Sequence, residues 1–261
     1  MKILLTGSNG YIGREIKHKL SQTCSLVCAS RNEVDLTSYS QVDKFFSLHE
    51  GFDVVIHAAN KGGSRLERDD SSSLDQNIQM YNNLLRNSHR FEKFIFLGSG
   101  AEIYRSNSFY GLSKKAISKS LEDKNKFYNL RIFGIFNHAE PETRFIKSNL
   151  LRYINKTPMK IHENRLMDFV YMEDFLEVLN YYLTENPEPF SIDCCYQPLK
   201  SFRSIAEEIN KLDSHTVEII ENFDKEVDDY ISQGDRKLPV ATKGLNYGLI
   251  KTYEKLCQIK S

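Results

Sequence analysis

Two side chains able to exchange a proton stand four residues apart in the segment YGLSK. Tyr110 and Lys114 have the spacing that places two side chains on one face of a helix. A free tyrosine has a pKa of about 10, and lowering it to ~7 requires about 4 kcal/mol of preferential stabilisation of the phenolate. A lysine ammonium one turn away supplies such stabilisation. The spacing therefore predicts a general acid–base pair that protonates a ketone oxygen during reduction.

The strand end before this helix should supply a hydroxyl that orients the ketone. Ser99, in GSGAEIY, is followed by Gly100, which has no side-chain donor where a hydroxyl is needed. A one-residue slip or bulge between Gly100 and Ile103 would present the Ser99 hydroxyl to the substrate, and glycine tolerates the backbone angles of such a distortion. We predict that Ser99 is the carbonyl-orienting donor rather than a purely structural serine. Ser108 and Glu102 are the next candidates.

A glycine-rich turn near the N-terminus has the features of a pyrophosphate-binding loop. In KILLTGSNGYIG, the glycines follow an expected strand and open an expected helix. Such a turn lets backbone N–H groups and a helix N-terminus approach a phosphate closely. The alternative is an ordinary glycine-rich turn. The expected cofactor contacts in this segment are Gly7, Asn9, Gly10, Tyr11, Ile12, Gly13 and Arg14.

The end of the second expected strand should choose between the two nicotinamide cofactors. An acidic residue there binds the free ribose 2′-hydroxyl, whereas an arginine favours the 2′-phosphate. Arg31 stands at this position, and a guanidinium binds phosphate with two hydrogen bonds. A solvated loop arginine is the alternative. We therefore expect NADP(H) as the cofactor, with NAD as the alternative, and Asp35 as an adenine-side acceptor or a helix cap.

Composition limits the class of protein. Lys+Arg and Asp+Glu each number 35 in 261 residues, which argues against a nucleic-acid or membrane-surface binder with a basic excess. The five cysteines form no evident disulfide framework, so reduced thiols are expected. No signal peptide or transmembrane segment is evident, and a cytoplasmic protein is expected. No His/Cys cluster has metal-ligand spacing, so no metal is expected.

Short apolar runs alternate with amphipathic stretches in the N-terminal part, a pattern typical of a parallel sheet wrapped by helices. The expected strands are 2–6, 26–30, 53–57, 93–97 and 127–133. The expected helices between them are 11–21, 38–49, 73–89 and 109–122. Later expected elements are helix 142–155, strand 159–162, and helices 173–184, 201–212 and 247–258. Pro187 and Pro189 suggest the start of a second lobe.

These elements predict an α/β fold: a Rossmann-like doubly wound parallel sheet with a small C-terminal α+β substrate lobe. The NADP-binding domain is expected at 1–136, with a returning segment at about 164–184. The substrate-binding lobe is expected at 137–163 and 185–261.

Motifs along almost the whole chain resemble those of the extended short-chain dehydrogenase/reductase family, which includes nucleotide-sugar epimerases, dehydratases and ketoreductases. The matching segments are TGSNGYIG, VDL, VVIHAAN, LDQNIQMYNNLL, YGLSK, LRIFGIF, MDFVYMEDF and TKGLNYGLIKTYEKL. The segments SRNEVDLTS and HAANKGGS are similar to those of NADPH-dependent nucleotide-sugar 4-ketoreductases such as the GDP-fucose synthases. The family's reductases also have a Gly-Ser pair at the strand end, which supports Ser99 as the donor.

The resemblance implies further contacts. It adds cofactor contacts by Leu36, Ala58, Ala59 and Asn60, and places Lys114 against the nicotinamide ribose. Substrate contacts are expected from Glu102, and from Arg144 and Arg165 on the nucleotide diphosphate, with solvated surface charges as the alternative. Relatives often dimerise through the helices that match 73–89 and 109–122, so a homodimer is expected.

The leading hypothesis is an NADPH-dependent reductase of a nucleoside-diphosphate 4-keto sugar in surface polysaccharide or deoxysugar synthesis. Ring epimerisation is not expected, because the positions that match its acid–base residues in GDP-fucose synthase are Ala101 and Arg144, neither a suitable acid–base. His138 is the residue that could change this expectation. The alternatives are an NAD-retaining epimerase or dehydratase, against which Arg31 argues, and a non-catalytic nicotinamide-binding sensor or scaffold. Only Glu102 remains of the Thr-Asp-Glu cluster that dehydratases carry.

Overall fold

The computed structural model describes residues 1–64, 67–163, 165–223, 228–234 and 237–260. The chain divides into two compact units. The first unit contains Met1–Arg131 and Leu179–Ile192, and the second contains Ile132–Val178 and Asp193–Ser261.

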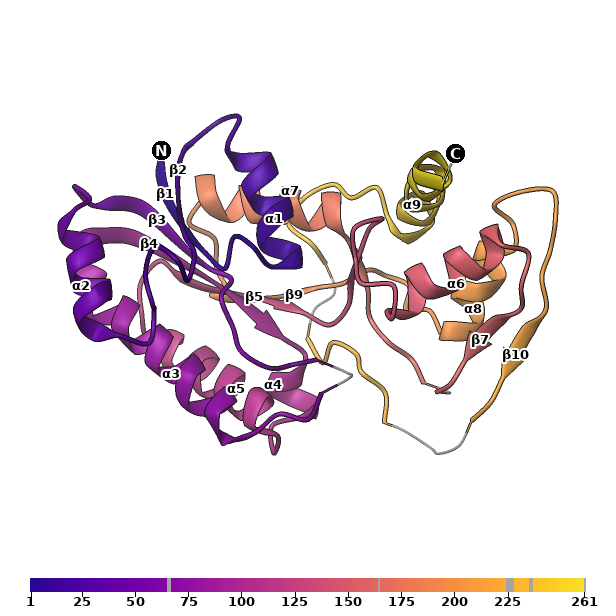
Figure 1. Ribbon diagram of the computed structural model, residues 1–261, viewed down its shortest axis with the longest axis horizontal. Coiled ribbons are helices and arrows are strands. Elements are labelled where there is room, and N and C mark those ends of the chain that lie inside the picture. The colour runs from indigo at the N-terminus through magenta and orange to yellow at the C-terminus, as the bar shows by residue number, and fades with distance from the viewer. Residues whose placement is uncertain (65–66, 164, 224–227, 235–236, 261) are drawn as a thin grey trace. The chain divides into compact units, whose positions relative to one another are not determined.

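A central sheet organises the first unit. Six strands of the described chain pair in the order β2-β1-β3-β4-β5-β9 (Figure 1). They are β1 (Lys2–Thr6), β2 (Ser25–Ala29), β3 (Phe52–His57), β4 (Phe91–Ser99), β5 (Phe127–Ile132) and β9 (Ser191–Cys194). The pairs β1–β2, β1–β3 and β3–β4 are parallel. The apolar residues of β1, β3 and β4 are buried on both faces, as in other parallel sheets. The expected Rossmann-like α/β fold is confirmed.

Helices cover both faces of this sheet. The helices α2 (Tyr39–Ser47), α3 (Ser71–Arg86) and α5 (Phe109–Leu121) lie on one face, and α1 (Tyr11–Leu20) lies on the other (Figure 1). Phe46 of α2, Leu84 of α3 and Leu121 of α5 belong to one buried hydrophobic cluster, which also contains Phe94 of β4. Two short turns, η1 (Ser88–Arg90) and α4 (Ala101–Tyr104), flank β4.

The edge of the sheet next to β5 differs from the sequence-based expectation. Residues 185–192, expected in the second lobe, belong to the first unit, and β9 is the sixth strand. The backbone N–H of Asn129 in β5 donates to Phe190 O at 2.7 Å. The returning segment is thus Leu179–Ile192 rather than about 164–184. That one unit binds the cofactor and the other the substrate stays a proposal.

The second unit has its own core. It contains α6 (Phe145–Ile154), α8 (Phe202–Ile209), α9 (Leu245–Lys260) and two strand pairs, β6 (Ile135–Phe136) with β8 (Val170–Tyr171) and β7 (Met159–Ile161) with β10 (Ile219–Glu221). The helix α7 (Met172–Thr184) begins in this unit and ends in the first. Tyr153, Ile205 and Leu249 are completely buried together. Apolar faces of three helices therefore close around these short strands.

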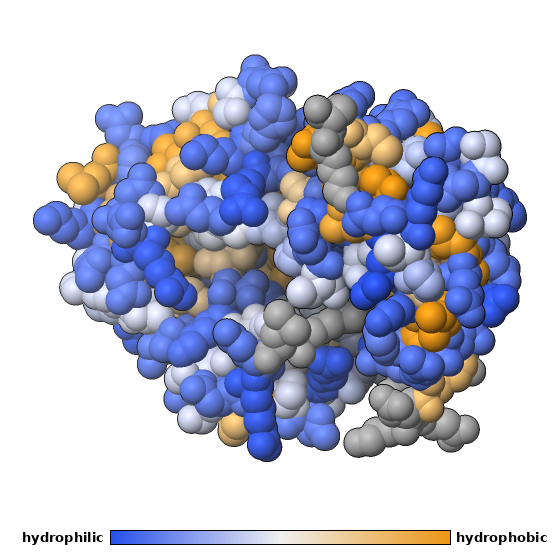
Figure 2. All heavy atoms as spheres, turned by 45° about the vertical axis from the view of Figure 1, so that its right-hand side comes forward, coloured by the Kyte–Doolittle hydropathy of each residue, from blue (hydrophilic) through white to orange (hydrophobic). Residues whose placement is uncertain are grey.

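The face of the molecule drawn in Figure 2 is mostly hydrophilic. On the face drawn in Figure 2, hydrophobic residues form small, separate groups among charged and polar ones. Within the described residues, no helix combines the length and hydrophobicity needed to cross a membrane. No disulfide links the cysteines at positions 24, 28, 194, 195 and 257, all of which the structure describes.

Candidate active site

The glycine-rich turn joins β1 to α1. Gly7 has a φ of +68°, and a Cβ at this position would lie 2.6 Å from the backbone nitrogen of Ala59, so only glycine fits. Gly10 is the N-cap residue of α1, and as a glycine it has no side chain that could bind the backbone N–H groups of the first turn. Gly13 packs directly against the carbonyl of Gly7. Tyr11 and Ile12 form the first turn of α1, and the turn as a whole has the geometry that pyrophosphate-binding loops use.

A buried hydrogen-bond chain fixes the strand ends beside this turn. The Thr6 hydroxyl accepts the Ala59 N–H at 3.2 Å and lies 2.9 Å from His57 Nδ1. Burial, together with the charge of Lys114, lowers the pKa of His57 to about 3. The imidazole is therefore neutral, and its Nδ1 shares a hydrogen bond with the Thr6 hydroxyl. This chain holds the loop of Ala58 and Ala59 against Gly7.

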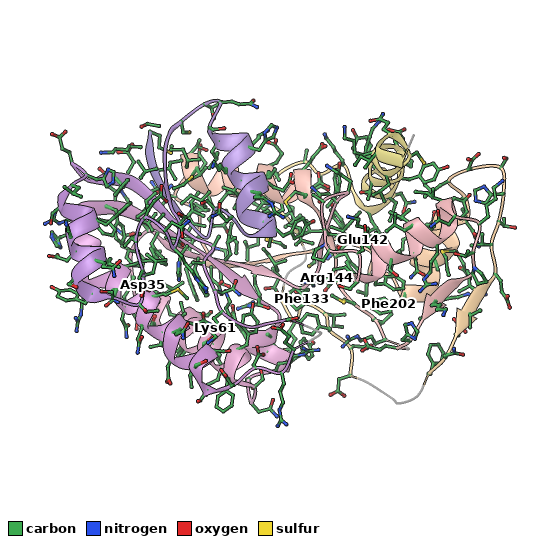
Figure 3. The ribbon with its side chains drawn as sticks, viewed as in Figure 1. Asp35, Lys61, Phe133, Glu142, Arg144 and Phe202 are labelled. Atoms are coloured by element: carbon green, nitrogen blue, oxygen red, sulfur yellow. The ribbon has the colours of Figure 1, made fainter. Side chains whose placement is uncertain are left out.

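The end of β2 carries the residues expected to choose the cofactor. Arg31 is exposed immediately beyond the strand. Glu33, which the sequence did not single out, accepts the Ser30 N–H at 2.8 Å, and this hydrogen bond lowers the pKa of its carboxyl. Asp35 (Figure 3) accepts the backbone N–H and the hydroxyl of Thr37 at 2.9 and 2.7 Å. Asp35 thus stabilises the turn before α2 through Thr37. Its contact with the adenine stays a prediction.

The other expected cofactor contacts have varied surroundings. Arg14 Nη1 donates to Asn9 O at 3.0 Å, which braces the glycine-rich turn. Leu36 is buried in the core, with its carbonyl bound by Asn83 Nδ2 at 2.9 Å. Asn60 is exposed and donates to Gly62 O at 3.2 Å.

Lys114 and Tyr110 lie together on α5, as their spacing predicts. Lys114 is only 4% exposed, and its Nζ donates to the carbonyl of Leu97 at 2.8 Å. The ammonium lies 4.4 Å from the ring centre of Phe96 and 5.6 Å from that of Tyr110. Burial lowers the pKa of Lys114 to about 8, and the negative charge of Glu102 opposes this shift. Lys114 is therefore a buried cation beside a phenol ring.

The loop after β3 packs against Tyr110. Gly63 has a φ of +77°, and a Cβ there would lie 2.8 Å from Cζ of the Tyr110 ring. The side-chain amide of Asn77 in α3 binds the backbone of Lys61 (Figure 3). Its Oδ1 accepts the Lys61 N–H at 2.8 Å, and its Nδ2 donates to the Lys61 carbonyl at 3.0 Å. The same amide donates to Ser113 Oγ at 3.0 Å, and Ser113 donates to the Tyr110 carbonyl at 2.7 Å. Asn77 therefore ties this loop to the turn that carries Tyr110.

The backbone around Ser99 differs from the predicted bulge. Gly100 is helical, with φ −55° and ψ −17°, and α4 begins at the next residue. The Ser99 hydroxyl accepts the Ala101 N–H at 3.2 Å. Ser108, the fallback donor, is the N-cap of α5 and accepts the Gly111 N–H at 3.0 Å. A helical turn, rather than a bulge, therefore follows Ser99.

Glu102 points into the protein. It is 5% exposed, and its Oε1 accepts the Ser99 N–H at 2.9 Å. Its Oε2 accepts Asn129 Nδ2 and Arg131 Nε, both at 3.0 Å. This burial favours a positioning role over the direct substrate contact expected from the sequence. Asn129 and Arg131 were not predicted. Arg131 lies within the LRIFGIF motif, whereas Asn129 directly precedes it.

Arg144 and Arg165 both belong to the second unit. Arg144 is the partly exposed N-cap residue of α6 (Figure 3). The Arg165 side chain is 8% exposed, forms an ion pair with Glu163, and lies 6.0 Å from the ring centre of Tyr230. Their predicted phosphate contacts stay predictions.

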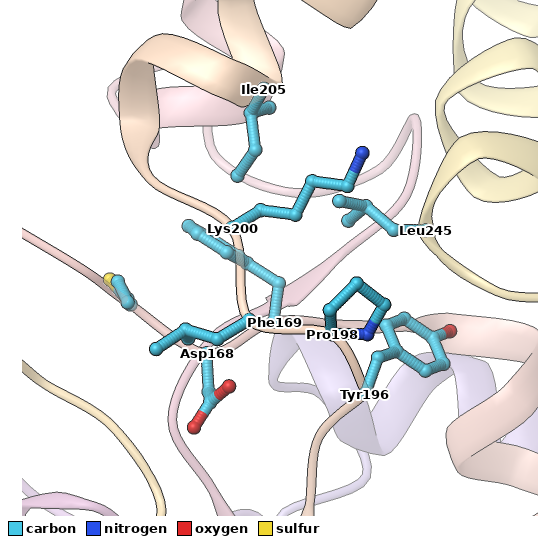
Figure 4. A pocket seen from close by; sticks show the side chains of 9 residues that line it. Asp168, Phe169, Tyr196, Pro198, Lys200, Ile205 and Leu245 are labelled. Atoms are coloured by element: carbon cyan, nitrogen blue, oxygen red, sulfur yellow. The ribbon is translucent and has the colours of Figure 1, made fainter.

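A small pocket in the second unit was not predicted. It is lined by Met167, Asp168, Phe169, Tyr196, Pro198, Leu199, Lys200, Ile205 and Leu245 (Figure 4). The Asp168 carboxylate accepts the Ser232 N–H at 2.6 Å, so it holds local structure. Asp174 does the same through the N–H groups of Lys243 and Gly244 at 2.8 and 3.0 Å. Among the described residues, no three His, Cys, Asp or Glu side chains gather in a way that could hold a metal ion.

Comparison with solved structures supports the fold. A UDP-glucose 4-epimerase from Thermotoga maritima with UDP-glucose has a TM-score of 0.84 at 19% identity, and the match covers 100% of both chains. A GDP-mannoheptose C4 reductase from Campylobacter jejuni with NADP bound has a TM-score of 0.81 at 17% identity, covering 100% of this chain and 98% of that one. At such identities the likeness is one of fold.

Curated relatives match part of the chain. A GDP-L-fucose synthase from Sinorhizobium fredii is 34% identical over 141 residues, which are 51% of this chain and 44% of that protein. A GDP-L-colitose synthase from Yersinia pseudotuberculosis is 29% identical over 162 residues, 60% of this chain and 48% of that protein. The chain thus matches less than half the length of these relatives. Residues 3–193 match the model of the NAD dependent epimerase/dehydratase family. The chain therefore belongs to this family of enzymes.

Proposed function

We propose that the protein is an NADPH-dependent reductase of a nucleoside-diphosphate 4-keto sugar that acts without ring epimerisation. The observation that carries this proposal is the buried Lys114 ammonium, 5.6 Å from the ring centre of Tyr110, at the end of β4 in a Rossmann-like sheet. Curated relatives named GDP-L-fucose synthase and GDP-L-colitose synthase support a sugar nucleotide as substrate. A role in polysaccharide or deoxysugar synthesis, in the cytoplasm and as a homodimer, is part of the same proposal.

The residues around the glycine-rich turn fit a nicotinamide dinucleotide. The close approach of Gly7 to Ala59 leaves no room for a side chain, as a backbone cradle for a pyrophosphate requires. Bound cofactor would supply a hydride to C4 of the sugar. Arg31 would favour NADPH, because only the 2′-phosphate offers its guanidinium a charge-assisted contact.

Three side chains have separate roles in the proposed reaction. Ser99 would donate a hydrogen bond to the ketone oxygen and orient it. Tyr110 would give its phenolic proton to that oxygen as negative charge develops there. Lys114 would stabilise the resulting phenolate, and this attraction is stronger in a buried site than in water.

A substrate panel tests the proposal. The full chain is mixed with NADPH or NADH and with 4-keto sugars carried on GDP, dTDP or UDP, and loss of reduced nicotinamide is followed by its absorbance. We expect oxidation of NADPH with at least one 4-keto sugar, and none in the Tyr110→Phe variant. Oxidation at the wild-type rate in that variant, or NADPH binding with no turnover on any 4-keto sugar, would contradict the proposal.

An NAD-retaining epimerase is the second candidate, and the family description favours it. Such an enzyme returns its hydride to the sugar and keeps the cofactor. Purified protein that carries bound NAD and interconverts two sugar nucleotides would favour this candidate. A dehydratase is less well supported, because Glu102 is buried with both oxygens bound to protein donors.

A further inference from the structure

A buried carboxylate holds the end of β4 in place. Glu102 Oε1 accepts the backbone N–H of Ser99 at 2.9 Å, while Oε2 accepts Asn129 Nδ2 and Arg131 Nε at 3.0 Å each. The side chain of Glu102 is 4% exposed and that of Arg131 is 19% exposed. A carboxylate removed from water to this extent needs a paired charge and hydrogen bonds. Arg131 and Asn129 provide both.

This arrangement links two neighbouring strands. Asn129 and Arg131 belong to β5, whereas the group bound by Oε1 is the last residue of β4. A Cβ at Gly98 would overlap both Asn129 Oδ1 and Glu102 Oε1, so the β4 backbone lies directly against this network. Because Glu102 touches both strands, it sets the position of the Ser99 backbone relative to β5.

Glu102 also acts on the buried cation. The titratable groups that face the Lys114 ammonium are Glu102 from α4, His57 from β3 and Tyr110 from α5 itself. His57 is neutral, so Glu102 supplies the negative charge among these groups. Burial lowers the pKa of Lys114 to about 8, and Glu102 raises it again in part.

We propose that Glu102 is a positioning residue, which holds Ser99 in register through its backbone N–H and supports the charged form of Lys114. This inference rests on the proposed reductase function, because it assigns roles to Ser99 and Lys114 in that chemistry. It replaces direct contact between Glu102 and substrate, since both carboxylate oxygens already accept hydrogen bonds from the protein.

The Glu102→Gln variant tests the proposal. Glutamine has one oxygen and one NH₂ group, so it cannot accept hydrogen bonds from both Ser99 and Arg131. We expect kcat to fall about 10- to 100-fold, with little change in KM for the sugar nucleotide or in NADPH affinity. The alkaline limb of the pH–rate profile should also move to lower pH, because Lys114 loses the anion that favours its charged form. Glu92→Gln, at an exposed position of β4, is the matched control and should leave both unchanged.

Two measurements need no substrate. Amide hydrogen exchange at Ser99 should be faster in Glu102→Gln than in the wild type, and the NMR titration of the Lys114 ammonium should shift to lower pH. If the wild type reduces no 4-keto sugar, the proposed function fails, and these two measurements still decide whether Glu102 holds Ser99 and supports Lys114.

A double variant separates positioning from stability. Arg131→Met leaves the buried carboxylate without its charged partner and should destabilise the fold, whereas Glu102→Leu with Arg131→Met replaces the pair by apolar side chains and should recover stability. Turnover should remain low in the double variant because Ser99 has no acceptor for its N–H. Wild-type turnover in the double variant, or an unmoved pH profile and unchanged Ser99 exchange in Glu102→Gln, would overturn the proposal.

Discussion

At the scale of single residues, the proposed chemistry depends on a buried cation. Lys114 is buried against the ring of Phe96, and its ammonium is held by the Leu97 carbonyl. Low local polarity makes the ammonium harder to keep charged, but it also strengthens its effect on a phenolate at Tyr110. The surroundings that lower the pKa of Lys114 therefore also strengthen the attraction that its ammonium would exert on a phenolate in the proposed reaction.

The Tyr110→Phe variant should keep its cofactor and lose nearly all turnover. The change removes the proton donor but leaves the ring that packs against Gly63. NADPH affinity from fluorescence titration and turnover on the active sugar nucleotide give the two readings. Substantial turnover by this variant would mean that the proton comes from another group.

The pH dependence of the reaction should reflect Lys114. Its pKa is about 8 rather than 10.5, so the ammonium is present below this pH and lost as the pH rises through it. We expect kcat/KM to fall on the alkaline side with a midpoint near this value, because kcat/KM reports groups of the free enzyme. Lys114→Met should lower the rate at every pH and remove this limb. A rate that stays constant far into the alkaline range would show that the charge is not needed.

Ser99→Ala should fold, bind NADPH normally and lose about 100-fold in turnover, the usual cost of one preorganised donor. The Ser99 hydroxyl accepts the Ala101 N–H at 3.2 Å, and a hydroxyl that accepts one hydrogen bond can also donate one. Circular dichroism, cofactor titration and steady-state kinetics give the three readings. Near-wild-type turnover in Ser99→Ala would place the donor elsewhere.

The sequence predicted some of these residues and not others, for a physical reason. Tyr110 and Lys114 are neighbours on one helix, so their spacing alone brings them together. The partners of Glu102 lie 27 and 29 residues further along the chain, at Asn129 and Arg131. Only the pairing of β4 with β5 makes them neighbours, and no local pattern reports that pairing.

At the scale of elements, the same distinction holds. The strands β1 and β3 were predicted almost to the residue, because each contains a run of three buried apolar residues. The strand β9 was missed, because Pro187 and Pro189 precede it and indicate a boundary between lobes. Tertiary pairing with β5 overrides that local signal.

Lys93 of β4 fastens the returning segment to the sheet. It is 6% exposed, and its Nζ donates to the carbonyls of Tyr182, Leu183 and Glu185 at 2.8, 3.0 and 2.6 Å. A cation at the C-terminus of a helix satisfies carbonyls that have no partner within the helix. Lys93 therefore joins the end of α7 to the middle of the sheet.

Lys93→Met should lower the free energy of unfolding by about 1–3 kcal/mol, because the carbonyls lose a charged donor while the burial cost of the ammonium is relieved in part. Urea unfolding monitored by circular dichroism measures the change. Lys115→Met, at an exposed position of α5, is the control and should change stability by less than about 0.5 kcal/mol. Equal stability of Lys93→Met and the wild type would show that these hydrogen bonds contribute little.

At the scale of the whole molecule, the chain forms two compact units that are not continuous in sequence. It leaves the first unit after Arg131, returns at Leu179 and leaves again after Ile192. Neither unit can therefore be produced by cutting the chain once, and their roles are best separated by point variants of the full chain. The proposal is that the first unit holds the cofactor and the second the nucleotide diphosphate.

Arg31 and Arg144 provide the test of this division. Arg31 is exposed at the end of β2 in the first unit, and Arg144 precedes α6 in the second. Arg31→Ala should weaken NADPH binding about 10- to 100-fold, leave NADH binding unchanged, and leave KM for the sugar nucleotide unchanged at saturating cofactor.

Arg144→Ala should raise KM for the sugar nucleotide about 10-fold or more and leave NADPH binding unchanged, because one charge-assisted phosphate contact is lost. Arg203→Ala, which removes an exposed arginine paired with Glu207 and Glu221, is the control and should change neither. Loss of NADPH affinity in Arg144→Ala would contradict the division. So would a wild type that binds NADPH and NADH equally well, together with an Arg31→Ala variant that binds both as the wild type does.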